Sequence, residues 1–105
     1  MMVLQMVSTN EALLEEIAEY LLAEKLLYNV MLREVFDYRT GDGNGGIVTT
    51  QRYGLKGISK SLLFGRINEL LRKKYKDKMP LLYSEPIILI DPEQTDVIAE
   101  SLVKI

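Results

Sequence analysis

The sequence predicts an α+β fold with the element order strand–helix–strand–strand–helix–strand. Three features predict it: short apolar runs near both ends, two amphipathic segments at helical spacing, and a glycine-rich turn between two runs of strand-forming residues. The 105 residues fit a single domain, residues 1–105, and the 48% apolar and 27% charged composition is typical of globular proteins. We expect an antiparallel four-stranded sheet with two helices on one face, followed by a short C-terminal helix.

The first strand and helix are predicted from the residues that begin the chain. Met2 to Val7 is a short apolar run and predicts a strand. Ser8 with Glu11 fits a capping box, and Asn10 is an alternative N-cap. Leucine and isoleucine then recur at helical spacing among glutamates, which predicts a helix from about Glu11 to Leu26.

A hairpin is predicted in the middle of the chain. Asn29 to Arg39 is rich in strand-forming residues, and Thr40 to Gly46 holds four glycines, a composition typical of a turn. Ile47 to Ser59 then predicts the third strand. Gly54 and Gly57 within it indicate a bulge, a bend or a close backbone approach.

The last third of the chain predicts a helix, a strand and a short helix. Ser61 is a plausible N-cap for the second helix, whose C-terminal end carries a basic cluster that suits the helix dipole. Leu81 to Ile90 predicts the fourth strand, in which Pro86 marks a break or an edge. Asp91 followed by Pro92 is typical of a helix start.

The predicted strands are apolar on both faces, although two helices cover only one face of such a sheet. In the first strand Met2, Leu4 and Met6 share one face, and Val3 and Val7 share the other with Gln5. Ile87 to Ile90 is apolar throughout. We therefore expect other subunits to cover the second face; the alternative is that the C-terminal helix folds across it. The candidate contact residues are Val3, Val30, Leu32, Val35, Phe36, Ile47, Val48 and Ile88.

Composition argues against several classes of function. The chain has no cysteine and no histidine, which removes thiolates, the commonest metal ligand and the commonest general base. Thirteen basic and fifteen acidic residues leave no large positive field for nucleic acid. No apolar run is long enough for a membrane helix, and the first residues lack the basic start of a signal peptide. We expect a cytoplasmic protein with no catalytic residues, no metal site and no cofactor.

Four segments carry a resemblance to a known family. They are Val7–Ala12, Leu21–Leu26, Lys60–Leu70 and Tyr83–Ile88. The second is similar to a Leu-Leu-Glu-Glu-Arg-Leu helix end, and the fourth to a Tyr-Glu-Val-Pro-Glu-Ile strand. In their order and spacing they resemble the CutA family, the divalent-cation tolerance proteins within the PII-like superfamily.

The resemblance implies a ferredoxin-like βαββαβ fold, a tight homotrimer in which the long hairpin reaches onto a neighbour, and a binding or regulatory role. The chain departs from the family pattern at polar positions. Leu81 and Leu82 stand where members usually carry His-Pro, and Ile87 stands where they carry Glu. These losses affect the features that would bind metal, so we expect metal binding to be weak or non-specific.

Tyrosines, lysines and one glutamate are the candidate residues for a ligand cleft between subunits, although such tyrosines also suit core edges and interfaces. The candidates are Tyr38, Tyr53, Lys56, Lys60, Tyr83 and Glu85. An alternative function is a PII-like sensor that binds adenine nucleotides at subunit clefts. There the loop of residues 40–51 would be flexible, and phosphate contacts would come from Lys56, Lys60, Arg66 and Arg72. A third possibility is a small enzyme that uses a lysine or tyrosine at a subunit boundary.

Overall fold

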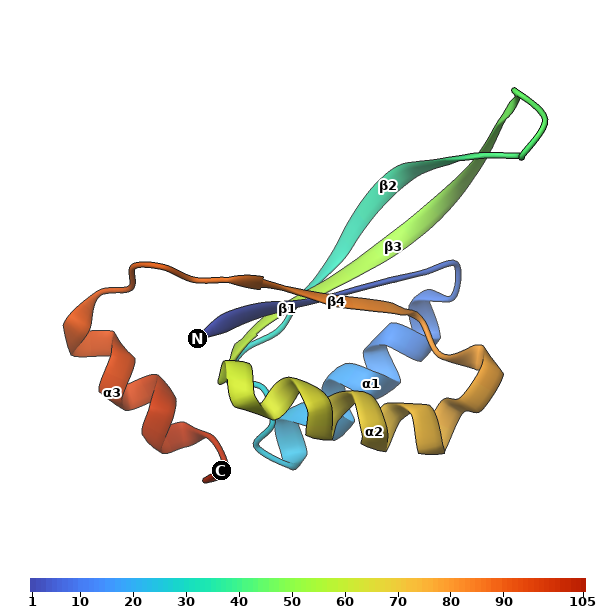
Figure 1. The fold of residues 1–105 in the computed structure, drawn as a ribbon. Coiled ribbons are helices and arrows are strands. Elements are labelled where there is room, and N and C mark those ends of the chain that lie inside the picture. Colours follow the sequence, from blue (N-terminus) through green and yellow to red (C-terminus); the bar gives the residue numbers. More distant parts are fainter.

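The computed structural model describes residues 1–105 and has an antiparallel four-stranded sheet with two helices on one face (Figure 1). The strands are β1 (Met2–Ser8), β2 (Met31–Gly41), β3 (Ile47–Ser59) and β4 (Leu81–Pro86), in the sheet order β2-β3-β1-β4. The helices are α1 (Glu11–Ala23), α2 (Phe64–Tyr75) and α3 (Pro92–Ser101), with one-turn 3-10 segments at Ser61–Leu63 and Lys76–Lys78. The predicted α+β class and element order are confirmed. None of the helices is long and apolar enough to cross a membrane.

The hydrophobic core lies between the sheet and the helices. It is built from alternate residues of the central strands and from one face of each helix, because these are the periods at which strands and helices present one side. Its fully buried members include Leu4, Met6, Leu14, Ile17, Leu55, Ile67 and Leu71. Burying such a side chain stabilises the fold by about 1.5 to 3 kcal/mol.

Helix α1 is capped by Asn10 and not by a capping box. The Asn10 side-chain oxygen accepts a hydrogen bond from the amide of Leu13 at 3.1 Å. The Ser8 hydroxyl instead accepts from the amide of Asn10 at 3.0 Å, which fixes the turn before the helix. Of the two predicted alternatives, the asparagine cap is the one formed.

Helix α1 ends at Ala23, earlier than the predicted Leu26. The cause is Lys25, whose φ of 57° lies in the left-handed region and stops the helix. The amides of Leu26 and Leu27 then turn back to the carbonyl of Leu21, at 2.9 and 3.3 Å. The turn buries both leucines in the core.

Two predicted boundaries in the second half of the chain are wrong. Ser61 does not cap α2: it begins a 3-10 turn, and α2 starts at Phe64 with no side-chain cap. Strand β4 ends at Pro86 and not at Ile90, because its partner β1 begins at Met2, which stands opposite Pro86. The amide of Ile87 makes one further hydrogen bond, to the backbone oxygen of Met1 at 3.1 Å. The apolar residues Ile87–Ile90 are therefore not part of the sheet, and the prediction that they give the fourth strand two apolar faces is wrong.

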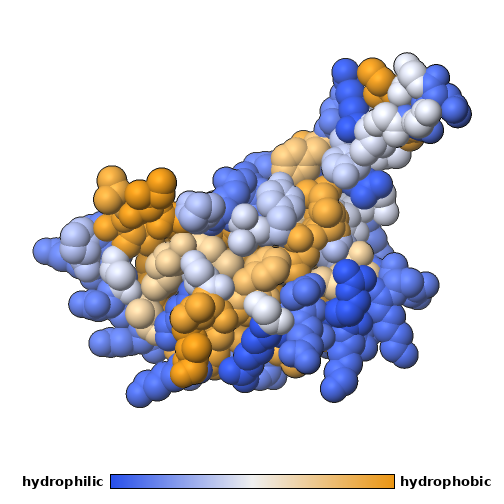
Figure 2. Space-filling model, in the orientation of Figure 1, coloured by the Kyte–Doolittle hydropathy of each residue, from blue (hydrophilic) through white to orange (hydrophobic).

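The segment between β4 and α3 is an exposed apolar connection. Ile88 and Leu89 are 89% and 90% exposed. Figure 2 shows hydrophobic atoms gathered at this end of the molecule.

Helix α3 lies on the helix side of the sheet (Figure 1). The Asp91 side chain caps it by accepting from the amide of Glu93 at 3.1 Å, as predicted. Ile98 and Leu102 are buried in the same core as α1 and α2. The alternative that the C-terminal helix folds across the opposite face of the sheet is therefore wrong.

The β2–β3 hairpin projects beyond the rest of the sheet (Figure 1). Gly43 and Gly45 turn the chain at its tip with φ values of 87° and 86°. Near its base, β2 has an irregularity between Leu32 and Glu34, where Arg33 takes a φ of 72°. This bulge changes which side chains of β2 face each side of the sheet.

Candidate functional site

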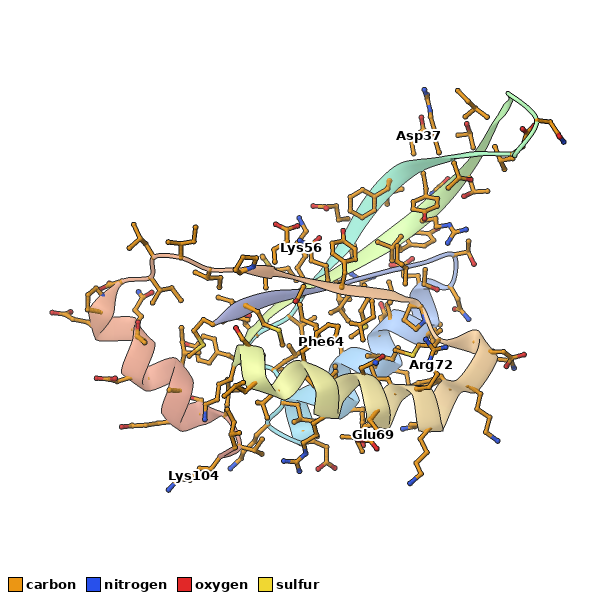
Figure 3. The ribbon with its side chains drawn as sticks, viewed as in Figure 1. Asp37, Lys56, Phe64, Glu69, Arg72 and Lys104 are labelled. Atoms are coloured by element: carbon orange, nitrogen blue, oxygen red, sulfur yellow. The ribbon has the colours of Figure 1, made fainter.

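The face of the sheet away from α1 and α2 is not covered by any element of the chain, and we call it the open face. Strand alternation places Gln5 of β1 and Lys56 of β3 on it, because Leu4 and Leu55 point into the core. Figure 3 shows Lys56 on the side of the sheet away from Phe64 of α2. The side chains of the open face include Val3, Gln5, Val7, Met31, Glu34, Phe36, Tyr38, Thr50, Arg52, Lys56, Ile58, Leu81, Tyr83 and Glu85.

A row of polar side chains crosses the open face from one edge strand to the other, and we call it the polar row. On β2 and β3, the ammonium nitrogen of Lys56 lies 3.2 Å from a carboxylate oxygen of Glu34. Gln5 on β1 stands opposite Lys56 on one side and Tyr83 on the other. The Tyr83 hydroxyl donates to the Gln5 side-chain oxygen at 3.1 Å, and the Gln5 amide nitrogen donates to Glu85.

The ion pair in the polar row is partly exposed in the single chain. The side chains of Lys56 and Glu34 are 35% and 49% exposed. Such pairs contribute about 0 to 1 kcal/mol in water because the solvent screens them. The pair would interact more strongly if another molecule covered the open face and excluded water.

An aromatic hollow adjoins the polar row. Its volume is about 220 Å³, and its lining residues are Val7, Phe36, Asp37, Tyr38, Arg39, Leu81 and Tyr83. The Arg52 guanidinium lies 4.3 Å from the centre of the Tyr38 ring, a cation–π contact. The hollow is smaller than the roughly 300 to 1,000 Å³ typical of ligand pockets, so in one chain it suits an inserted side chain better than a nucleotide.

Four of the six predicted cleft residues share the open face. Tyr38 and Tyr83 line the hollow, and Lys56, Tyr83 and Glu85 belong to the polar row. The other two lie elsewhere. Tyr53 stands opposite Ser8 and packs against the core, and the Lys60 ammonium donates to the backbone oxygen of Val103 at 3.0 Å.

The four cations considered for nucleotide binding are not brought together in one chain. Lys56 is on the open face, whereas Arg66 and Arg72 are on α2, on the opposite side of the sheet (Figure 3). Arg72 is near the end of α2 and donates to the backbone oxygen of Lys76 at 3.5 Å. A phosphate bound by all four would need more than one chain to assemble the site.

Sequence reasoning missed two members of the polar row, Gln5 and Glu34. Gln5 had a usable signal, because it is the one polar residue in the apolar run Met2–Val7. Glu34 had none, because its contact with Lys56 depends on the bulge at Arg33. No group of three or more Asp, Glu, His or Cys side chains is arranged to hold a metal ion.

Comparisons with known proteins find likeness in structure alone. No protein-family model and no curated protein sequence matches the chain. CutA1 from Pyrococcus horikoshii matches with a TM-score of 0.83 at 14% identity, covering 99% of this chain and 100% of that chain. The divalent cation tolerance protein Cut A1 from Thermus thermophilus matches with 0.82 at 20%, covering 98% and 100%. The periplasmic divalent cation tolerance protein CutA from Archaeoglobus fulgidus matches with 0.80 at 20%, covering 96% and 98%.

The chain therefore has a ferredoxin-like α+β fold with an extended β2–β3 hairpin and a short C-terminal helix. This is the fold of the CutA proteins over nearly the whole chain, as the resemblance predicted. At identities of 14 to 20% the likeness establishes the fold.

Proposed function

We propose that the protein is a CutA-like homotrimer with a binding or regulatory role and no catalytic activity. The observation that carries the proposal is the open face, which no element of the chain covers. The fold it shares with the CutA proteins, together with the four sequence segments that resemble theirs, supports three as the number of subunits.

Apolar surface and unpaired strand edges both favour association through the open face. Leu81 is 47% exposed there, and it borders the aromatic hollow. Strands β2 and β4 are the two edges of the sheet, so their outer backbone groups have no strand partner within the chain. A closed ring of copies would cover the open face and protect these edges together.

The residue inventory supports binding over catalysis. Lys56, a candidate base, is held in an ion pair with Glu34. The serine hydroxyls of the chain have no histidine to activate them, and there is no cysteine that could serve as the nucleophile in their place. The names of the Thermus and Archaeoglobus proteins refer to divalent-cation tolerance. For this chain we expect weak or non-specific metal binding, because thiolate and imidazole ligands are lacking.

Light scattering at micromolar concentration tests the assembly. We expect a mass of about three times the 12.0 kDa chain. The variant Leu81→Asp should lower the mass, because it places a carboxylate at the proposed interface. Leu62→Asp is the matched control, since Leu62 is 76% exposed on the 3-10 turn before α2, away from the open face. A stable monomeric wild type would contradict the proposal.

Thermal-shift screening against metals, nucleotides and small metabolites tests the binding role. Calorimetry with ATP, ADP and AMP tests the PII-like alternative separately. Absence of heat with all three nucleotides would remove that alternative, and turnover of any screened compound would contradict the non-catalytic role. The cytoplasmic location stays a prediction.

A further inference from the structure

Two charged side chains of the open face have no partner of opposite charge in the chain. The ion pairs of the molecule join Arg33 to Glu11 and Glu15, Arg39 to Asp37, and Lys56 to Glu34. On the open face, Lys56 and Glu34 therefore neutralise each other. Arg52 and Glu85 remain, one cation and one anion.

Both of these side chains are held in place by neighbours that leave charged atoms free. The Arg52 guanidinium stacks on the Tyr38 ring, and its Nε donates to the Thr50 hydroxyl at 3.3 Å. Its two terminal nitrogens make no hydrogen bond within the chain. One oxygen of Glu85 accepts from Gln5, and the other has no partner. Side chains held in this way lose little conformational freedom when they bind.

Arg52 and Glu85 are too far apart to pair within one chain. Glu85 stands opposite Val3 of β1. Tyr53 stands opposite Ser8, so Arg52 lies one step beyond the end of β1. Arg52 and Glu85 are therefore six residue steps apart along the strand direction. At about 3.3 Å for each step, the separation is about 20 Å. They mark opposite ends of the open face.

We propose that Arg52 of one copy pairs with Glu85 of a second copy across the open face. This inference rests on the proposed homotrimer. Covering the face would remove water from both groups, and a buried charge without a partner opposes association strongly. Pairing them between copies leaves no charge of the open face uncompensated. The free nitrogens of Arg52 and the free oxygen of Glu85 suit a short charge-assisted contact.

A charge-reversal cycle tests the pair. The variants are Arg52→Glu, Glu85→Arg and the double variant, with Glu69→Arg as control. Glu69 is exposed on α2, on the other side of the molecule (Figure 3). Sedimentation at several concentrations and salt levels measures the dissociation constant. We expect each single reversal to raise it by at least about tenfold, the double variant to restore most of the loss, and the control to match the wild type.

Two results would overturn the pair: single reversals that assemble as tightly as the wild type, or a double variant no better than the weaker single. Circular dichroism identifies variants that fail to fold. The neutral set Arg52→Gln, Glu85→Gln and their double then supplies the same cycle without repulsion, and additive effects in it would also overturn the pair. A monomeric wild type would refute the homotrimer itself. A trimer that ignores these substitutions would refute the pair alone.

Discussion

The ring of Phe36 lies over Gly54 at the base of the hairpin, where a Cβ on Gly54 would stand 2.5 Å from Cε2 of the ring. The missing side chain on β3 thus makes room for an aromatic ring from β2. Gly57 makes a second close approach, because a Cβ there would collide with the backbone oxygen of Asn29. The two glycines predicted to mark a bulge, a bend or a close approach both mark a close approach.

Gly57→Ala should destabilise the protein more than Gly54→Ala. At Gly57 the obstacle is the backbone carbonyl of Asn29. The side-chain oxygen of Asn29 accepts a hydrogen bond from the amide of Ile58 at 2.8 Å, so the residue cannot move freely. We expect a loss of about 3 kcal/mol for Gly57→Ala, and about 1 kcal/mol for Gly54→Ala, where the Phe36 ring can shift.

Urea denaturation measures both losses in the free energy of unfolding. Gly65→Ala is the control, because Gly65 lies in α2 with nothing within 4 Å of an added Cβ. It should stabilise the protein by up to about 1 kcal/mol. Equal losses at Gly54 and Gly57 would show that the Asn29 carbonyl does not restrict the site.

The sequence predicted elements well wherever local chemistry decides the structure. The bounds of β3, Ile47–Ser59, follow from the glycine turn before it and the apolar pattern within it. The start of α3 follows from Asp91 and Pro92. The end of α1 was missed, because lysine is not a residue type that favours the left-handed conformation of Lys25. That conformation is imposed by burial of the two leucines after it.

The polar row could be predicted only in part. Lys56, Tyr83 and Glu85 were candidates because of residue type and place in the chain. Their arrangement depends on strand register, and a shift of one residue moves a side chain to the other face. The bulge at Arg33 makes such a shift in β2, and no local sequence motif predicts that bulge. Two of the predicted contact residues, Val30 and Leu32, pack against the core instead.

Ser59→Ala should destabilise the protein by about 1 to 3 kcal/mol. The Ser59 hydroxyl is fully buried and donates to the backbone oxygen of Leu26 at 2.6 Å, so its loss leaves a buried carbonyl short of a donor. Ser101→Ala is a matched control, since the exposed Ser101 hydroxyl also donates to a backbone oxygen at 2.6 Å. Water can replace that bond, so thermal and urea unfolding should change little. Equal losses for the two variants would contradict the role of burial.

Tyr75→Phe should stabilise the protein by up to about 1 kcal/mol. The Tyr75 hydroxyl is buried without a hydrogen-bond partner, so removing it relieves a desolvation cost. Tyr28→Phe, at a partly exposed tyrosine, should be neutral by the same urea measurement. A clear loss of stability in Tyr75→Phe would show that the hydroxyl has a partner, such as an ordered water.

Alkaline pH should destabilise the wild type more than Tyr75→Phe. Burial raises the pKa of Tyr75 above its ordinary value of 10.0, with Lys74 opposing and Glu16 reinforcing the rise. A raised pKa in the folded state means that the unfolded chain loses the proton first. Stability from this group is therefore present below pH 10 and falls as pH rises beyond it. Unfolding curves of the two proteins should diverge above pH 10, and parallel curves would contradict this assignment.

Acid should disturb the hairpin tip only at pH values below those at which an ordinary carboxyl group titrates. The Asp42 carboxylate accepts hydrogen bonds from the amides of Asn44 and Gly46, at 2.7 and 3.0 Å, and these lower its pKa. A lowered pKa means that order at the tip is present at pH values above the unfolded pKa of about 3.9 and is lost as pH falls through the folded pKa.

The amide NMR shifts of Asn44 and Gly46 should titrate with a midpoint below that of an unfolded aspartate. Asp42→Asn should abolish the titration, because its side-chain oxygen still accepts hydrogen bonds but carries no ionisable group. A midpoint at or above about 3.9 would show that the turn does not hold the carboxylate in solution.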